Sequence, residues 1–389
     1  MSSRIVKGFN EFIGNEAMKR AAIRKTIIKN FELFGFEPTE SPTVEFEEFV
    51  GKDANEDTIS EIFRLNDRGK RKLALKYEST FQLKRLARNQ KLPFKRYIIS
   101  QVFRDEPTGS NRFREFSQCD CDVVGSGLKD EAEVLSLVKR ILGEVGVSSR
   151  IYINNRKLLN EIMVDVGIEE KNREQAVREI DKLDKLPREK VAGNLKKIGA
   201  ERLLDVVSGK DFSKYKFYSE IRELIKLCKM FDVDVEFDPT LARGLSYYNG
   251  TVFEVKTESL KGTICGGGAY LVGDVQAFGF AFGLDRLCGL SELNGDGVEI
   301  LVLSLGEDEV AVDLVKKMRD DGIRTLLMMD KSLSKGLEYA NGKNISKVVI
   351  VGKDEVDNGK FRLRDMKTGS EDLVSDDGIL DLVRIDGGD

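Results

Sequence analysis

The stretch Phe103–Phe116, FRDEPTGSNRFREF, decides how the central part of the chain is interpreted. It follows RYIISQVF (96–103), which is rich in β-branched and aromatic residues, and it leads into residues 112–124, which alternate in the same way. This composition favours strands, and residues 107–111 between them are turn formers. The sequence therefore predicts an antiparallel hairpin with a long connection.

The polar side chains of this hairpin are of the kinds that bind nucleotides. Residues two apart on a strand share a face, which predicts Arg104 beside Glu106 on one strand. On the other strand it groups Arg112 with Arg114 and Phe116. Guanidinium groups bind polyphosphates through paired hydrogen bonds, and an aromatic ring offers a face to a base. A solvated surface ribbon of mixed charge is the alternative that the hairpin alone leaves open.

Composition narrows the chemistry. The 389 residues predict two or three domains, and a net charge of −4 neither requires nor excludes nucleic-acid binding. No apolar run is long enough to span a membrane, which predicts a soluble, cytoplasmic protein without a membrane partner. Histidine and tryptophan are absent, so a histidine triad, a histidine-ligated metal and imidazole acid–base catalysis are excluded. Chemistry here must depend on arginines, carboxylates, the backbone and a hard cation.

The cysteines indicate neither disulfides nor a metal site. There are five, an odd number, and no two have CxxC spacing. Cys119 and Cys121 lie two apart in the second predicted strand and are interpreted as buried structural thiols.

The N-terminal third predicts a mixture of helices and strands. Apolar residues at helical spacing predict a helix over 16–34, ended by Gly35, and an extended segment follows to about residue 50. Residues 60–77 predict two strands joined by a turn at 67–69. A helix is then predicted from Glu78–Thr80 to Arg88, with Ser79 or Thr80 as its cap.

The middle of the chain predicts a helical insertion within a β-rich domain. A helix over 130–145 and a strand over 149–154 come first, and long charged helical segments follow from about residue 155 to 231. Their charge is interpreted as a solvated face. Strand texture returns at Val233. The glycines at 266–268 allow a ligand to approach the backbone closely, although neither a dinucleotide-binding fingerprint nor a P-loop is present.

The last hundred residues predict a separate small domain. The linker candidate is Asn294–Gly297 (NGDG), and beyond it strands and helices alternate as in a small parallel α/β domain. A hairpin turning at Thr368–Gly369 and a short helix close the chain.

Five motifs in order resemble those of class II histidyl-tRNA synthetases over essentially the full length. The opening stretch resembles motif 2 and GFAFGLDRL (279–287) resembles motif 3. LARGLSYYNGTVFEV (241–255) and CGGGAY (265–270) resemble the family's R-G-L-D-Y-Y and G-G-G-R-Y-D signatures, and EIDKLDK (179–185) falls in its insertion region.

The resemblance implies an α+β catalytic domain on an antiparallel sheet, with a helical insertion and a C-terminal α/β anticodon-binding-like domain. The expected boundaries are 1–154 and 233–293 for the catalytic domain, 155–232 for the insertion and 298–389 for the anticodon-binding domain.

The resemblance also implies site residues. ATP would be bound by Arg104 at the α-phosphate, Arg112 and Arg286 at the outer phosphates, Glu106 at the adenine edge and Phe116 against the adenine face. Histidine would be bound by Glu78, Thr80 and Gln118 at its amino group, by Asp122, Tyr247 and Tyr248 around its imidazole, and by Arg243, which with Arg104 would act catalytically.

The implied function is ATP-dependent activation of histidine and its transfer to tRNA(His), with Mg²⁺ on the phosphates and a homodimeric assembly. The sequence departs from the family pattern at Ala269, Leu271, Ser246, Lys76 and Pro107. The alternatives are a non-catalytic paralog that senses histidine and regulates histidine biosynthesis or another enzyme, and an ATP-binding scaffold that does not bind tRNA.

Overall fold

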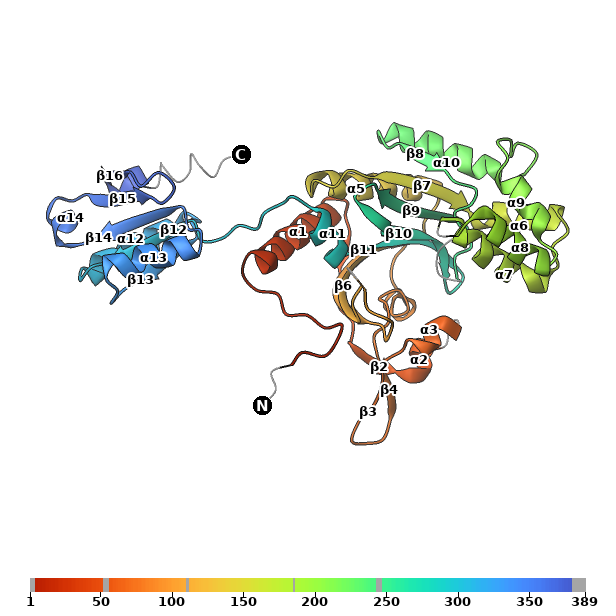
Figure 1. Ribbon diagram of the computed structural model, residues 1–389, viewed down its shortest axis with the longest axis horizontal. Helices are drawn as coiled ribbons and strands as arrows, with labels where there is room; N and C mark the ends of the chain where they lie inside the picture. Colours follow the sequence, from red (N-terminus) through yellow and green to blue (C-terminus); the bar gives the residue numbers. More distant parts are fainter. Residues whose placement is uncertain (1–3, 52–55, 110–111, 185, 243–246, 380–389) are drawn as a thin grey trace. The chain divides into compact units, whose positions relative to one another are not determined.

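The computed structural model describes residues 4–51, 56–109, 112–184, 186–242 and 247–379 (Figure 1). The chain divides into two compact units. The first comprises Met1–Ile13 and Lys19–Leu293, and the second comprises Gly14–Met18 and Asn294–Asp389. No helix of the described ranges is long and apolar enough to cross a membrane.

The first unit is built on an eight-stranded sheet with the order β1-β5-β6-β11-β10-β9-β7-β8. The strands are β1 Glu37–Pro38, β5 Phe94–Phe103, β6 Glu115–Val124, β7 Arg150–Asn155, β8 Val235–Phe237, β9 Thr251–Thr257, β10 Leu260–Val272 and β11 Val275–Gly283. Only the outermost pairs, β1 with β5 and β7 with β8, run parallel among the described pairings. The prediction of an α+β domain on an antiparallel sheet is confirmed.

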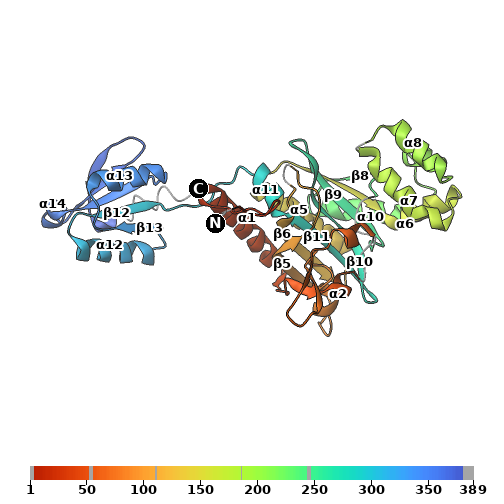
Figure 2. The same cartoon turned by 60° about the horizontal axis from the view of Figure 1, so that its bottom comes forward.

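Two long helices cover one face of this sheet (Figure 2). They are α1 (Gly14–Leu33), whose predicted end at Gly35 is confirmed by a positive φ of 76°, and α5 (Leu128–Glu144). Phe31 of α1 packs on Tyr97 and Phe280, with ring centroids 5.2 and 6.1 Å apart. Cys119 and Cys121 are fully buried in the same core, which confirms their interpretation as structural thiols.

The predicted hairpin is β5 and β6, ten residues each, with Arg96 opposite Asp122 and Phe103 opposite Glu115. The second strand begins at Glu115 and not at Arg112, so that part of the prediction was wrong. Arg104–Arg114 form the connection, in which Arg112 makes an isolated bridge with Gly109. Their side chains therefore do not follow the two-residue alternation of a strand.

A smaller sheet, β2-β4-β3, precedes the hairpin in sequence. Its strands are β2 Val44–Phe46, β3 Arg64–Asn66 and β4 Lys72–Leu75, and the predicted turn at 67–69 joins the last two. The extended segment predicted to residue 50 ends earlier, because Glu47–Gly51 form the helix α2, and a second short helix is α3 (Glu56–Ser60).

The helix predicted from Glu78–Thr80 is wrong at its start. Only α4 (Leu83–Leu86) forms, after Gln82. The carbonyl of Ser79 accepts a hydrogen bond from Nη2 of Arg96 at 3.1 Å, and its hydroxyl lies 3.1 Å from that of Ser100. Ser79 is therefore bound to β5 and does not cap a helix, which leaves Glu78 and Thr80 in an irregular segment.

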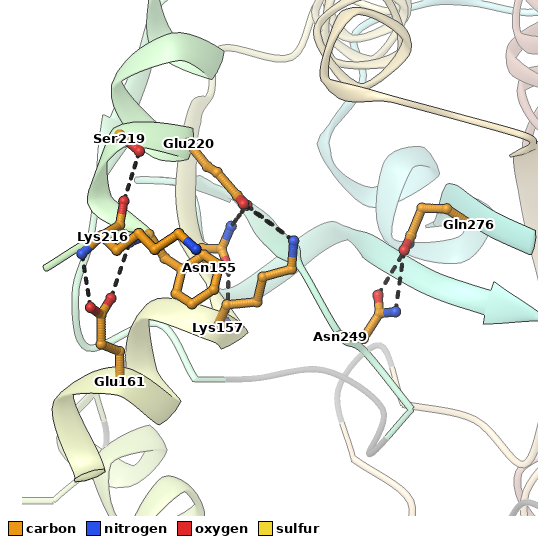
Figure 3. A network of polar contacts seen from close by, with 9 residues as sticks. Asn155, Lys157, Glu161, Lys216, Ser219, Glu220, Asn249 and Gln276 are labelled. Carbon is orange, nitrogen blue, oxygen red and sulfur yellow. Dashed lines mark hydrogen bonds and ion pairs between the residues drawn. The ribbon is translucent and has the colours of Figure 1, made fainter.

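The helical insertion is confirmed as helical. It contains α6 Arg156–Asp165, α7 Glu170–Ile180, α8 Arg188–Lys197, α9 Glu201–Val207 and α10 Tyr218–Met230, with a 3-10 turn at Asp181–Asp184. Figure 3 shows how it is joined to the sheet. Asn155, at the end of β7, accepts from the backbone N–H of Lys157 and donates to Glu220 of α10 at 3.0 Å, and Glu161 of α6 accepts from the backbone N–H groups of Lys216 and Phe217.

The second unit has a five-stranded sheet with the order β13-β12-β14-β15-β16. Its elements are β12 Ile300–Ser304, α12 Asp308–Asp320, β13 Thr325–Met328, α13 Leu333–Gly342, β14 Lys347–Val351, α14 Lys353–Asp357, β15 Phe361–Asp365 and β16 Glu371–Val374. The parallel strands β13, β12 and β14 and the closing hairpin were predicted, whereas the short helix α14 was missed.

Candidate functional site

Two adjoining pockets lie on the face of the large sheet that α1 and α5 leave open. Cys119 and Cys121 point into the core beneath the helices, so Gln118, Asp120 and Asp122 of the same strand face the opposite side. Small residues of the neighbouring strands, such as Gly279 and Ala281, leave room above this face.

The first pocket, here called the arginine pocket, is where the predicted ATP ligands meet. It is lined by Arg104, Glu106, Arg112, Phe113, Phe116, Gln118, Thr263, Ile264, Cys265, Gly266, Ala281, Gly283, Asp285 and Arg286. All five residues predicted to bind ATP are in this set. Three guanidinium groups around one cavity make a site that favours a polyanion.

Arg104 is fixed at the boundary between the pockets. Its guanidinium carbon lies 4.4 Å from the ring centroid of Tyr77 and 5.3 Å from that of Phe116. Its Nε donates to the carbonyl of Tyr77 at 3.4 Å. Arg104 lines both pockets, so its charge is available to ligands in each.

Glu106 and Arg112 form an ion pair across the connection of the hairpin. Glu106 is buried whereas Arg112 is exposed, and the hydrogen bond to Glu106 raises the pKa of Arg112. The backbone carbonyl of Glu106 also accepts from Nε of Arg114 at 3.2 Å. These contacts hold the connection in place although it is not a strand.

Arg286 enters the arginine pocket from α11 (Leu284–Leu290) and donates to the carbonyl of Thr263. The preceding residue, Asp285, fixes this helix. It accepts from Arg20 of α1 at 2.8 Å and from the backbone N–H of Ser117 at 3.1 Å. Asp285 was not singled out in the sequence, where its only signal was its place beside Arg286.

The second pocket, here called the acidic pocket, has a volume of about 380 Å³. It is lined by Glu78, Thr80, Arg104, Gln118, Asp120, Asp122, Tyr247, Tyr248, Phe253, Glu254, Gly266, Gly267, Tyr270, Gly279, Phe280 and Ala281. The described residues predicted to bind histidine are all in this set. Arg243 and Ser246 lie outside the described residues.

Asp122 is engaged on both carboxylate oxygens. Oδ2 lies 2.7 Å from Nη2 of Arg96, and Oδ1 accepts a hydrogen bond from the hydroxyl of Tyr270. A Cβ at Gly279 would approach Oδ1 to 2.0 Å, so the carboxylate can lie across β11 only because residue 279 is glycine. Burial raises the pKa of Asp122, an effect that Arg96 opposes.

Glu78 is a buried carboxylate without an adjacent cation. It is 3% exposed, and its Oε1 accepts from the hydroxyl of Tyr247 at 3.3 Å. Burial raises the pKa of Glu78 to about 8, although Arg104 opposes the shift. A ligand that brings an ammonium group to Glu78 would restore its charged form.

Three tyrosines close one side of the acidic pocket. The ring centroids of Tyr247 and Tyr248 are 5.2 Å apart, and that of Tyr270 lies 5.4 Å from Tyr247. The next residue, Asn249, exchanges side-chain hydrogen bonds with Gln276 (Figure 3), and Gln276 also donates to the carbonyl of Tyr270 at 2.9 Å. Gln276 therefore connects the segment bearing Tyr247 and Tyr248 to strand β10.

The residues at which the sequence departs from the family pattern are mostly outside the pockets. Ala269 and Leu271 belong to β10, where Ala269 is buried next to Gly250 and Leu271 is 45% exposed. Neither lines a pocket, because Gly266 and Tyr270 occupy the face of β10 that does. Lys76 is 1% exposed and donates to Ser41 at 3.3 Å.

Sequence reasoning missed Arg96, Asp120 and Tyr270 as site residues. The signal for Asp120 was present, because it lies two residues from Asp122 on a predicted strand and so had to share its face. Arg96 could be found only from the register, which places it opposite Asp122. Tyr270 was known as part of a signature, but nothing in the sequence paired it with Asp122.

An antiparallel sheet with adjoining polyanion and amino-acid pockets, followed by a small α/β unit, has the architecture of class II aminoacyl-tRNA synthetases. The family model for histidyl-tRNA synthetase matches residues 8–287, and that for an anticodon-binding domain matches residues 299–384. The chain is 34% identical to histidine–tRNA ligase of Phocaeicola vulgatus, with 98% of each chain covered. The chain therefore belongs to the histidyl-tRNA synthetase family.

Solved structures agree on the fold. Histidyl-tRNA synthetase of Nostoc sp. PCC 7120 is similar, with a TM-score of 0.87 at 26% identity, covering 99% of this chain and 100% of that one. An ATP phosphoribosyltransferase regulatory subunit/histidyl-tRNA synthetase of Bacillus halodurans gives a TM-score of 0.77 at 22% identity, covering 90% and 98%. The second likeness bears on the fold alone.

Proposed function

We propose that this chain is an active histidine–tRNA ligase, which joins histidine to ATP as an aminoacyl-adenylate and then transfers the histidyl group to tRNA(His). The observation that carries this proposal is the position of Arg104, which lines both pockets. The reaction brings a carboxylate and an α-phosphate together, and a guanidinium at the boundary of their two sites neutralises both anions and the charge that develops between them.

The arginine pocket accounts for ATP. Arg112 and Arg286 would bind the outer phosphates, Phe116 the adenine face and Glu106 the adenine edge. Among the described residues no group of three or more His, Cys, Asp or Glu side chains could hold a metal ion. Mg²⁺ would therefore take most of its ligands from phosphate oxygens and water, which suits its preference for oxygen ligands. When bound, it would supply additional neutralisation of the phosphates.

The acidic pocket accounts for histidine. Glu78, Thr80 and Gln118 would bind the amino group, and Oε1 of Gln118 has no hydrogen-bond partner among the described residues. Asp122, Tyr247 and Tyr248 would lie around the imidazole. A pocket of buried polar groups discriminates against side chains that leave those groups unpaired.

The proposed division of labour follows the expected boundaries. Residues 1–154 and 233–293 would activate histidine, 155–232 would be an insertion, and 298–389, which the anticodon-binding family covers almost entirely, would bind the tRNA(His) anticodon arm. A homodimer in the cytoplasm, where tRNA is charged, completes the proposal. Sedimentation of the full chain tests the dimer, and a tRNA shift assay with residues 1–293 compared with the full chain tests the role of 298–389.

Histidine-dependent exchange of pyrophosphate into ATP, followed by charging of tRNA(His), tests the activity. A histidine-sensing paralog is favoured by the name of the B. halodurans neighbour, and it predicts histidine binding without exchange. An ATP-binding scaffold predicts ATP binding without tRNA binding. Retention of Arg104, Arg112 and Arg286 supports the enzyme over both alternatives.

A further inference from the structure

Asp120 is a buried carboxylate that the proposed roles leave unused. It lines the acidic pocket and is 3% exposed. Its Oδ2 is fully buried and has no hydrogen-bond partner among the described residues. An unpaired buried carboxylate oxygen is costly, which indicates that a ligand supplies the missing donor.

Asp122, by contrast, has little capacity left. Its Oδ1 accepts from Tyr270 and its Oδ2 faces Arg96 at 2.7 Å. Asp122 could still accept a further hydrogen bond through a remaining lone pair, but its negative charge is already compensated by Arg96. The open acceptor on this strand is therefore Asp120.

The spacing along β6 also favours Asp120. Gln118, Asp120 and Asp122 follow one another on one face, and each step of two residues is about 6.6 Å. Gln118 lines both pockets, whereas Asp120 and Asp122 line only the acidic one. An amino acid whose carboxylate faces Arg104 and whose amino group reaches Gln118 brings its side chain over Asp120 before it reaches Asp122.

We propose that Asp120 is a specificity-determining residue that accepts a hydrogen bond from an imidazole N–H of histidine. This inference rests on the proposed function, in that histidine is the ligand of the acidic pocket. Asp122, with Arg96 and Tyr270, then acts as a positioning residue that shapes the pocket behind the ring.

A structural role is the competing explanation. Arg96, Lys76 and Arg104 exert attractive charge interactions on Asp120, and Asp122 repels it. In that case Asp120 would only balance the buried cations, and removing it would alter stability without a specific effect on the ring of the ligand. Binding measurements with matched ligands separate the two explanations.

The test is calorimetric binding of histidine and of imidazolelactate, in which a hydroxyl replaces the amino group, to Asp120→Ala and Asp120→Asn. Loss of a hydrogen bond to a buried charged acceptor should weaken histidine binding on the order of 10- to 100-fold for Asp120→Ala. Asp120→Asn retains an acceptor oxygen and should lose less. The factor should be the same for imidazolelactate, because the imidazole is unchanged.

Two controls accompany the variants. Asp274→Asn removes one negative charge from the exposed turn between β10 and β11 and should bind both ligands as the wild type does. Glu78→Gln should weaken histidine but not imidazolelactate. Melting temperatures report folding, and if Asp120→Ala fails to fold, Asp120→Asn carries the comparison.

Several outcomes would overturn the inference. These are binding within twofold of the wild type in the folded Asp120 variants, a loss confined to histidine, which would assign Asp120 to the amino group, or no histidine binding by the wild type. Pyrophosphate exchange measured in parallel keeps the proposed function separate. Exchange without an effect of Asp120 contradicts only this inference, and histidine binding that depends on Asp120 without exchange contradicts only the catalytic proposal.

Discussion

Arg96 and Asp122 form an ion pair of 2.7 Å in which the side chains are 0% and 4% exposed. They lie directly opposite each other on β5 and β6. A buried pair of this kind is expensive to break from one side, because the remaining charge has neither water nor a partner. It fixes the deep end of the acidic pocket and leads to the first prediction.

Arg96→Met should lower the free energy of unfolding by about 3–5 kcal/mol, the usual cost of leaving one buried charge unpaired. Urea titration followed by circular dichroism measures it. The double variant Arg96→Met with Asp122→Asn removes both charges and should recover a large part of the loss. A single-variant loss below about 1 kcal/mol would show that Arg96 does not stabilise Asp122.

Tyr270→Phe should weaken histidine binding while preserving the arginine pocket. The hydroxyl of Tyr270 donates to Oδ1 of Asp122, and its removal leaves that buried oxygen without this donor, at a cost of about 1–3 kcal/mol in stability. We expect a higher KM for histidine and an unchanged KM for ATP in pyrophosphate exchange. An equal rise in both would contradict the assignment of Tyr270 to the amino-acid side.

The sequence predicted the fold well where periodicity was long and unbroken. The helix over α1, the hairpin β5–β6 and the alternation of the second unit all form. The failures are local and have physical causes. Ser79 and its neighbours do not start a helix because Arg96 binds the carbonyl of Ser79, and Arg112 is not in a strand because Glu106 holds it in the connection.

The site was predictable as a set of residue types but not as a set of pairs. Motifs brought Arg104, Glu78 and Asp122 to one face, because strand alternation is readable from sequence. Pairing depends on register and on space between strands. That Asp122 lies across Gly279 to reach Tyr270 follows from coordinates alone.

Arg104→Ala should reduce the rate of pyrophosphate exchange by a factor on the order of 10²–10³ or more, the effect of removing one donor from developing charge. The fold should remain, because Arg104 is only partly buried between Tyr77 and Phe116. Arg88→Ala, an exposed arginine after α4, is the matched control. Exchange within a few fold of the wild type would refute the catalytic role of Arg104.

Arg112→Ala should act on ATP alone. Arg112 lines only the arginine pocket and pairs there with Glu106. Its loss should raise the KM for ATP by roughly tenfold, the effect of about 1.4 kcal/mol, and leave the KM for histidine unchanged. Initial rates over a matrix of both substrates measure this. If only the histidine KM rose, Arg112 would be misassigned.

Histidine binding should tighten as the pH rises from 6.5 to 8. Burial raises the pKa of Glu78 to about 8, so the free protein carries mostly the neutral acid below that pH, whereas an ammonium ligand requires the carboxylate. Binding should therefore release a proton from Glu78 and gain up to about tenfold in affinity per pH unit from this group. Calorimetry in two buffers of different ionisation enthalpy counts the protons.

Glu78→Gln should remove this part of the pH dependence, while any contribution from Asp120, whose pKa burial raises to about 7, should remain. Stability gives a second measure with a definite sign. The unfolded chain loses the Glu78 proton near pH 4.5 and the native protein keeps it to about 8, so the unfolded state binds fewer protons between these values. The free energy of unfolding should accordingly fall as the pH rises through this window, and fall less in Glu78→Gln. Identical pH profiles for the wild type and Glu78→Gln would mean that Glu78 is already ionised in the free protein.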